Sequence, residues 1–342
     1  MYRLILFISV ILLQSVGFPA YSREQDFPRK GEGIYAFLRR HNREGEAYYA
    51  EFMRLNKGML GEDKTLRKDV KYTIPPEMNT PATKDRERVS AGNRSINRKV
   101  MREPLFGKDY EYYNILDNSL AGADFYLVSG HGGPDCGAIA NVDRHQLHED
   151  EYAYDIILRL ARNLLQHGAT VHIIIQDRKD GIRDGLYLNN SKTETCMGKE
   201  IPLNQKKRLK QRTDRINKLR VRSRSHYQRA IFVHLDSRSH KQQLDVFFYY
   251  QNGVRASLNL AENMRKTFSA KYEEHQPGRG FSGTVTTRSL AVLNNTVPAS
   301  IFVELANMQN INDQKRYIRA DNRQALANWL ALGFMRDYKD SK

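Results

Sequence analysis

Apolar residues downstream of position 100 occur in two alternating patterns. Short apolar runs, each typical of a buried strand, occupy residues 125–128, 170–175, 230–235, 244–250 and 300–305. Between them apolar positions recur at helical spacing, and the predicted helices span residues 150–166, 259–268 and 313–332. Strands that alternate with helices predict an α/β fold whose mostly parallel sheet is flanked by helices. Ligands of such sheets bind beyond the carboxyl ends of the strands.

Residues 23–76 form a separate pattern. Two short helices are predicted over 33–41 and 47–55, and a strand is predicted over 66–74. Residues 77–99 are polar and rich in Pro, Thr, Asn and charge, which is typical of a linker. The chain is therefore expected to contain a small N-terminal domain (23–76), a linker (77–99) and a larger domain (100–342).

The first 22 residues have the pattern of a secretory signal peptide. A positive charge at Arg3 precedes an apolar run over 4–18, and small residues at Ala20 and Ser22 suit a cleavage site. A membrane anchor is the alternative, but the run is short for a span of about 20 residues and polar residues interrupt it. We therefore expect residues 1–22 to be removed and the protein to be exported, to the periplasm or the exterior, without a stable membrane span.

Charge changes this picture in one region. The 342 residues carry 55 Lys and Arg against 39 Asp and Glu, a formal net charge of +16, which indicates an anionic partner. Much of the excess lies in the basic segment 191–229, in which the spacing of Leu209, Ile216 and Leu219 indicates a helix. The segment is either a solvated, flexible loop or a regulatory insertion that attracts an anionic polymer. Export argues against nucleic acid as that partner. Two cysteines, Cys136 and Cys196, exclude a disulfide-rich scaffold and could form one disulfide.

Four polar residues lie where the predicted elements begin or end. His131 follows the first strand of the large domain in a glycine-rich turn, and Glu149 begins the next helix. His234 and Glu304 lie near the ends of two further strands. If the strands are parallel, His131, Glu149 and His234 meet at one edge of the sheet as a catalytic zinc site, and Glu304 is free to act as a base.

Each of these residues also has an ordinary structural interpretation. A histidine at a strand end is more often a hydrogen-bonding residue than a ligand, and Glu149 suits the positive end of a helix dipole. Glu304 is harder to explain in this way, because an acid inside an apolar strand costs several kcal/mol unless it is paired or functional. The joint placement of the four residues favours the metal site.

Four segments containing these residues resemble the motifs of the zinc-dependent N-acetylmuramoyl-L-alanine amidases, in the family's order. Residues 126–138 contain a Gly-His-Gly-Gly sequence similar to the first motif, and 149–156 resemble the second, which begins with a ligand Glu. Residues 232–237 resemble the third motif and 295–305 the last, which contains the catalytic Glu. The resemblance covers about residues 125–332.

This resemblance implies an amidase-like α/β fold and a cell-wall hydrolase. His131, Glu149 and His234 would bind Zn²⁺, and Glu304 would be the catalytic base during cleavage of the amide between N-acetylmuramic acid and L-alanine in peptidoglycan. Asp135 and Asp236 are candidate acceptors for the ligating imidazoles.

The sequence also departs from the family pattern. Val128-Ser129 replace Asp-Pro, Cys136 replaces Pro and Asp236 replaces Asn, and none of these changes removes a ligand. The expected partners are peptidoglycan and a protein activator, but not nucleic acid. The alternatives are another exported zinc peptidase or amidohydrolase of wall peptides, and a non-catalytic peptidoglycan-binding protein.

The N-terminal domain has a resemblance of its own. Residues 30–40 are similar to the opening of a LysM peptidoglycan-binding module, and Phe52, Leu55-Asn56 and 72–75 match its later landmarks. The resemblance implies a small LysM-like α+β fold that binds glycan. The alternative is a helical appendage that packs on the enzyme.

Overall fold

The computed structural model describes residues 24–29, 32–61, 65–77, 100–238, 240 and 243–342. The predicted signal peptide (1–22) and residues 78–99 of the predicted linker lie outside the described residues. None of the described helices is both long enough and apolar enough to span a bilayer.

A six-stranded sheet forms the centre of the larger domain, with the strand order β14-β13-β15-β12-β5-β8. The strands are β5 (Ala123–Ser129), β8 (Thr170–Ile173), β12 (Tyr227–Asp236), β13 (Phe247–Tyr250), β14 (Thr284–Thr287) and β15 (Ala299–Asn307). Neighbours among β8, β5, β12 and β15 run parallel, whereas β13 pairs antiparallel with β15. The predicted α/β fold with a mostly parallel sheet is therefore confirmed.

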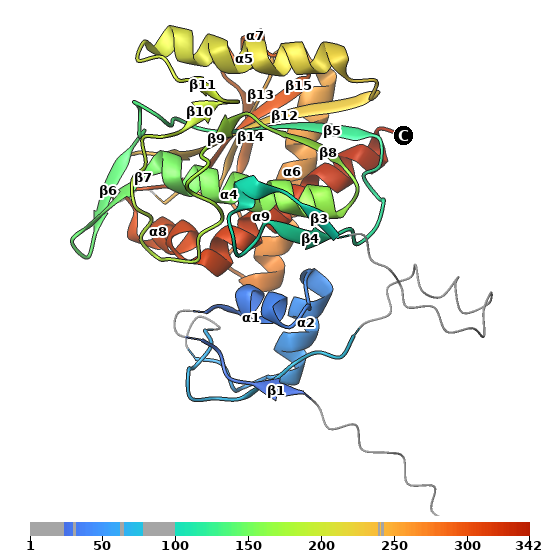
Figure 1. Cartoon of the computed structure of the whole chain (residues 1–342), viewed down its shortest axis with the longest axis vertical. Coiled ribbons are helices and arrows are strands. Elements are labelled where there is room, and N and C mark those ends of the chain that lie inside the picture. The colour runs from blue at the N-terminus through green and yellow to red at the C-terminus, as the bar shows by residue number, and fades with distance from the viewer. Residues whose placement is uncertain (1–23, 30–31, 62–64, 78–99, 239, 241–242) are drawn as a thin grey trace, which may run out of the picture.

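Helices cover both faces of this sheet (Figure 1). On one face lie α5 (Gln205–Arg222) and α7 (Ala291–Asn295); on the other lie α4 (Glu149–Gln166), α6 (Arg255–His275) and α9 (Ala320–Asp340). Successive side chains of a strand point to opposite faces, so β5 supplies Phe125 and Leu127 to the core under α4 and Tyr126 and Val128 to the core under α5. Burial on both faces explains why its sequence is a continuous apolar run.

Shorter elements connect the layers. A hairpin of β6 (Ile139–Val142) and β7 (His145–His148) leads into α4. The remaining elements of this domain are β3 (Val100–Arg102), the 3₁₀ helix η2 (Pro104–Phe106), β4 (Tyr112–Asn114), β9 (Ile175–Gln176), β10 (Thr195–Cys196), β11 (Lys199–Glu200) and α8 (Ile311–Ile318).

Two predicted elements are wrong in detail. The helix predicted over 313–332 is two helices, because Arg319 is extended (ψ 130°) and separates α8 from α9. The basic segment 191–229 contains the helix predicted through Leu209, Ile216 and Leu219, which is α5. The alternative of a solvated loop is wrong, because β10, β11 and α5 order most of the segment and Ile216 is fully buried. Cys136 and Cys196 are free thiols and form no disulfide with each other.

A buried ion cluster joins α4 to α9. Asp155 Oδ2 accepts hydrogen bonds from Arg159 Nε (2.7 Å) and Arg323 Nε (2.5 Å), and Asp155 Oδ1 accepts from the Arg183 amide (2.8 Å). The three charged side chains are almost completely buried. Arg159 Nη2 also donates to Asp184 Oδ1 (3.0 Å), so two carboxylates balance two guanidinium groups.

The N-terminal unit, residues 24–77, has two helices between two paired strands. Its elements are β1 (Gln25–Asp26), α1 (Ile34–Arg40), α2 (Glu46–Leu55) and β2 (Tyr72–Thr73), and β1 pairs antiparallel with β2. The strand is much shorter than the predicted 66–74. Buried Asn56 holds β2 to α2, because its side chain donates to Phe52 O and Thr73 O and accepts from the Thr73 amide.

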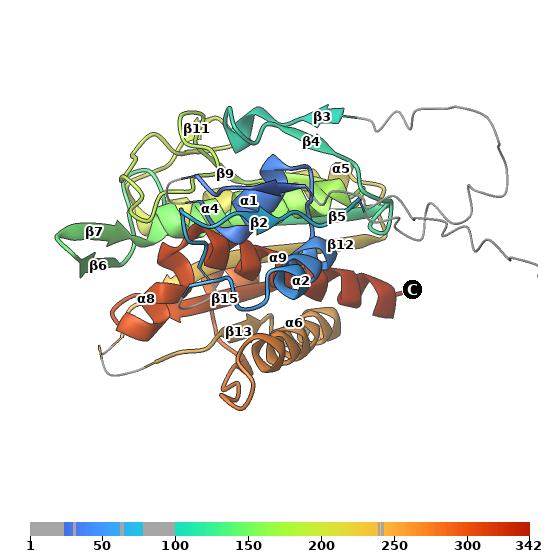
Figure 2. The same cartoon turned by 90° about the horizontal axis from the view of Figure 1, so that it is seen from below.

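This unit packs against α4 and α9 through polar contacts. Glu44 Oε2 accepts from Arg162 Nη1 (2.9 Å) and Gln166 Nε2 (2.6 Å), both near the end of α4. Asp321 Oδ2 in the first turn of α9 accepts from the amide of Ile34 (2.8 Å), the first residue of α1. Figure 2, a view from the side of this unit, shows α1 and α2 lying over α9.

Candidate metal centre

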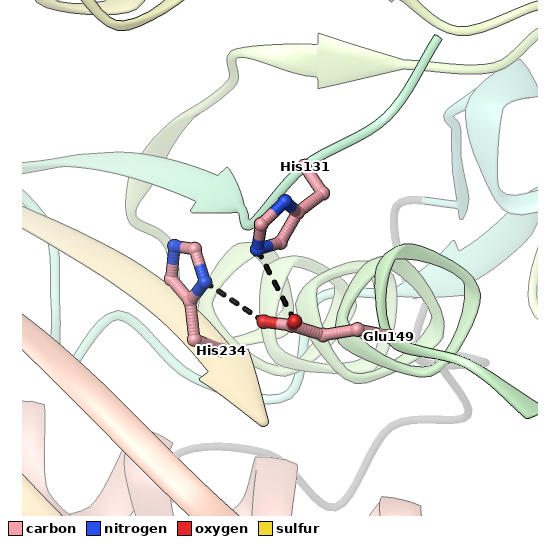
Figure 3. Close-up of side chains that lie close together, drawn as sticks. All are labelled: His131, Glu149 and His234. Carbon is pink, nitrogen blue, oxygen red and sulfur yellow. Dashed lines mark hydrogen bonds and ion pairs between the residues drawn. The ribbon is translucent and has the colours of Figure 1, made fainter. Parts of the chain in front are cut away.

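The structure brings His131, Glu149 and His234 together at the carboxyl edge of the sheet (Figure 3). His131 follows β5, His234 lies near the end of β12, and Glu149 is the first residue of α4. His131 Nε2 lies 3.2 Å from Glu149 Oε2, and His234 Nδ1 lies 2.9 Å from Glu149 Oε1. One ligand atom from each side chain lies within 4.8 Å of the other two, as the sequence predicted from parallel strands.

Glycines make this approach possible. Gly137 has φ +71°, and a Cβ on it would lie 2.6 Å from Glu149 Oε2 and 2.7 Å from His131 Cδ2. A Cβ on Gly130 would collide with the ring of His234. His131 itself has φ +60°, a left-handed conformation that is uncommon outside glycine and that turns its ring back towards α4.

Hydrogen bonds and burial set the charges at this site. Burial alone would lower the pKa of the His131 imidazole, but hydrogen bonds to Asp135 and Glu149 raise its pKa to about 10. Burial would raise the pKa of Glu149, but the two imidazoles hold it well below its ordinary value. Burial lowers the pKa of His234, which favours the neutral imidazole that can bind a metal.

The candidate acceptors Asp135 and Asp236 have different surroundings. Asp135 Oδ2 lies 3.0 Å from His131 Nδ1, the ring nitrogen that faces away from Glu149, and also accepts from Arg208 Nη2 of α5 (2.6 Å). Asp236 instead forms an ion pair with Arg238 and accepts from the amide of Ser237. The structure thus places Asp135, but not Asp236, against a proposed ligand.

Glu304 lies beside this group on the neighbouring strand. In the parallel pairing of β12 and β15, Glu304 is the register partner of His234, so both side chains lie on the same face of the sheet. Phe302, two residues earlier, stacks on the His234 ring at 4.2 Å between centroids. Glu304 is 7% exposed, and its Oε2 has no hydrogen-bond partner among the described residues. Burial, together with the charges of Glu149 and Asp236, raises the pKa of Glu304 to about 9.

The donor set fits a zinc ion. Two imidazole nitrogens and one carboxylate are typical of catalytic zinc sites, which leave a fourth position for water or substrate. Zinc sites commonly contain a carboxylate behind a ligating histidine, and Asp135 lies in that position behind His131. The buried oxygen of Glu304 has no hydrogen-bond partner among the described residues, so it is available to a ligand or reactant beside this group.

The sequence did not predict two further contributions. Arg212 of α5 is buried and donates to the carbonyl of His131, which helps to hold its left-handed turn. Phe302 fixes the ring of His234. In the sequence, nothing distinguishes Arg212 from the other basic residues of its segment, or Phe302 from the other apolar residues of its strand. The helical spacing of Arg208, Arg212 and Ile216 is the signal that could have identified the buried face of α5.

Comparison with known protein families identifies the family of this chain. A family model described as N-acetylmuramoyl-L-alanine amidase matches residues 126–335, and the chain therefore belongs to this family. A comparison with curated protein sequences gave no match.

Several solved structures are similar to this chain. The CwlD amidase from Clostridioides difficile, in complex with the GerS lipoprotein, is 20% identical, with 64% of this chain and 99% of that chain covered and a TM-score of 0.47. The catalytic domain of CwlV, an N-acetylmuramoyl-L-alanine amidase from Bacillus (Paenibacillus) polymyxa var. colistinus, is 20% identical, with 64% and 99% covered and a TM-score of 0.46. Ami1 from Mycobacterium smegmatis is 17% identical, with 65% and 99% covered and a TM-score of 0.45.

Proposed function

We propose that this protein is a zinc-dependent hydrolase that cleaves the amide between N-acetylmuramic acid and L-alanine in peptidoglycan. The observation that carries the proposal is the convergence of His131, Glu149 and His234 beside the unpartnered carboxyl of Glu304, in a member of this family. Its substrate places the reaction outside the cytoplasm, which agrees with the export signal predicted in residues 1–22.

Each residue has a separate role in this mechanism. His131, Glu149 and His234 would hold the zinc ion, which would lower the pKa of water and polarise the amide carbonyl. Asp135 fixes the orientation of the His131 ring, and Phe302 fixes that of His234.

Glu304 acts as the general base and then as the general acid. It accepts one from the attacking water and returns it to the departing amine of L-alanine. The raised pKa of its buried carboxyl suits the return step. A cation at the adjacent ligands would favour the ionised carboxylate, as the first step requires, because opposite charge stabilises the charged form.

The test combines metal content with product analysis. We expect the purified protein to contain one zinc per chain and to release peptides with a free L-alanine amino terminus from peptidoglycan, leaving the glycan strands intact. A chelator should abolish this release and added zinc should restore it. His234→Ala should lose both the zinc and the activity.

Other products would identify the alternatives. Cleavage within the stem peptide, with the bond to muramic acid intact, would indicate another zinc peptidase or amidohydrolase. Full zinc content without any turnover, under conditions in which an authentic amidase digests the same peptidoglycan, would indicate a non-catalytic wall-binding protein.

We propose further that residues 23–76 form a LysM-like glycan-binding domain, joined by the linker 77–99 to the amidase domain 100–342. The pairing of β1 with β2 around two helices, and the tie from Asn56 to β2, support this assignment. Peptidoglycan chains stripped of peptide should compete with wall for the protein, and Asn56→Ala should weaken its binding to wall. Competition by free stem peptides alone would contradict the proposal. Export predicts a mature amino terminus at residue 23, which terminal sequencing would check.

A further inference from the structure

A second group of potential metal ligands lies behind the first. Asp150 and Glu151 follow Glu149 in the first turn of α4, and Glu194 immediately precedes β10. One carboxylate oxygen from each of the three lies within 4.8 Å of the other two. The side chains belong to almost fully buried residues, with exposed fractions of 2%, 1% and 7%. These residues are not part of the proposed reaction.

The hydrogen bonds around this group leave one oxygen without a partner. Glu151 accepts from the amide of Ser191 and forms an ion pair with Arg183 Nη1 (2.9 Å). Glu194 Oε2 accepts from the amide of Gly133 (2.9 Å). Asp150 Oδ1 accepts from the amide of Glu151 (3.0 Å), whereas Asp150 Oδ2 is buried and has no hydrogen-bond partner among the described residues.

If all three carboxyl groups are ionised, the group holds more negative charge than its surroundings balance. Among the described residues, the ion pair that reaches the three acids comes from Arg183. Burying a carboxylate without a partner is costly, and carboxylates that crowd together repel one another. A cation bound between them would remove both penalties. The alternative is that the carboxyl groups are kept neutral by protons.

The geometry points to a second cation site formed by Asp150, Glu151 and Glu194, which binds a hard divalent ion such as Ca²⁺. All three ligands are oxygens, which hard cations prefer, whereas the first site offers two imidazole nitrogens that suit zinc. Oxygens around Ca²⁺ lie at about 2.3–2.6 Å from the ion and so at most about 5 Å from each other, as in this group.

An ion at this position would act on structure and not on the reacting bond. Asp150 and Glu151 belong to α4, and Glu194 contacts the turn that contains His131 through the amide of Gly133. The ion would therefore connect the start of α4, the segment before β10 and the glycine turn. We expect it to stabilise the fold around the first metal site without replacing the zinc.

The experiment uses the full-length chain loaded with one equivalent of zinc and titrated with Ca²⁺. We expect one Ca²⁺ per chain by mass spectrometry under non-denaturing conditions. We also expect a rise in Tm of about 4 °C at about 100 times the Kd. Asp150→Asn and Glu194→Gln should each lose the bound Ca²⁺ and the rise in Tm while keeping the zinc. Asp214→Asn, which removes an exposed carboxylate from α5, is the matched control and should keep both.

A variant of the first site separates this inference from the proposed function. His131→Ala should lose zinc but keep Ca²⁺, and this result does not depend on whether the protein is an amidase. Zinc as the sole bound metal at millimolar Ca²⁺ would overturn the inference, as would loss of Ca²⁺ from His131→Ala. The inference would also be overturned if Ca²⁺ had no effect on the Tm of the wild type and Asp150→Asn had a higher Tm than the wild type. That result would indicate that protons, and not a cation, neutralise the three carboxyl groups.

Discussion

Helix α4 contributes to two buried clusters of charge that differ in how completely they are neutralised. Around Asp155, each carboxylate oxygen accepts hydrogen bonds, and two guanidinium groups face two carboxylates. Around Glu149, about two turns earlier, Oε1 accepts from the Leu235 amide (3.2 Å) and Oε2 from the Ala138 amide (2.9 Å), but the nearby Glu304 has a buried oxygen without a partner among the described residues. The first cluster is complete within the fold, whereas the second contains one buried carboxylate oxygen, on Glu304, that no described residue satisfies.

This difference distinguishes buried charge that supports the fold from buried charge that serves a reaction. Burial costs both clusters desolvation, and partners within the protein offset this cost for the Asp155 cluster. We therefore expect substitutions in the Asp155 cluster to reduce stability and leave the chemistry intact. Substitutions of Glu304 should reduce activity and leave stability intact.

The largest effect is expected for Glu304→Gln. Loss of the proton-transferring carboxyl should reduce kcat by about 10³-fold, within the range of general acid–base catalysis. Zinc content should be unchanged, and the free energy of unfolding should stay the same or increase, because a buried, unpartnered carboxyl is removed. Peptide release and denaturant unfolding measure the two effects. Glu262→Gln, at a half-buried position on α6 away from the site, is the control. A strongly destabilised Glu304→Gln protein would show that Glu304 supports the fold, as Asp155 does, and would contradict this prediction.

Asp155→Asn should have the second largest effect, on stability. It leaves Arg159 and Arg323 buried without their shared carboxylate, and breaking a buried ion pair in this way costs about 3–5 kcal/mol. Activity per folded molecule should be close to that of the wild type. Urea unfolding and active-site zinc content provide the measurements, with the exposed Asp340→Asn as the control. Normal stability combined with lost activity would contradict the structural role of this cluster.

The same carboxylate predicts how stability depends on pH. Burial would raise the pKa of Asp155, but Arg159 and Arg323 outweigh it and hold the pKa at about 2. Because this pKa is lower in the folded than in the unfolded protein, the contribution to stability is present above about pH 4 and is lost as the pH falls towards 2. The loss is about 2 kcal/mol. Urea titrations between pH 5 and 2.5 should show a steeper decline for wild type than for Asp155→Asn; parallel curves would refute the assignment.

A smaller effect is expected for Asp135→Asn. The amide cannot hold the His131 ring as the carboxylate does, and loss of such an acceptor typically lowers zinc affinity about 10- to 100-fold. Asp236→Asn should leave zinc affinity unchanged, because Asp236 pairs with Arg238 and not with a ligand. Competition with a chromogenic chelator measures both affinities. Equal losses in the two variants would show that a general change of charge causes the effect.

The smallest effect concerns the exposed face of α5. Lys206, Lys207 and Lys210 are exposed near the start of this helix, whereas Arg208 and Arg212 are buried and contact Asp135 and His131. Replacing the three lysines by Gln should weaken binding to anionic wall polymer a few-fold at low salt and leave zinc content unchanged, because exposed charges act through a screened field. Sedimentation with wall material at two salt concentrations would check this, and a salt-independent loss would contradict it.

The sequence predicted the parallel strands that position the candidate site residues. Parallel strands carry His131, His234 and Glu304 to one edge because each apolar run ends at or near a polar residue, and that pattern can be read locally. Contacts between distant segments could not be read in this way. The bond from Asp155 to Arg323 joins residues 168 positions apart, and the antiparallel direction of β13 depends on its connections to β15. The break at Arg319 was missed because apolar spacing continues across it.

The contact of Glu44 with Arg162 has a consequence for any polymer held by the N-terminal unit. Glu149 begins α4 and Arg162 lies 13 residues further along, so about 20 Å of one rigid helix separates the metal centre from that contact. The helix therefore keeps the candidate metal centre and the contact with the N-terminal unit at a fixed distance from each other. If the N-terminal unit binds a glycan strand, the distance along that strand from the bound sugars to the bond at the candidate metal centre would be constant. The length of α4 would set this distance.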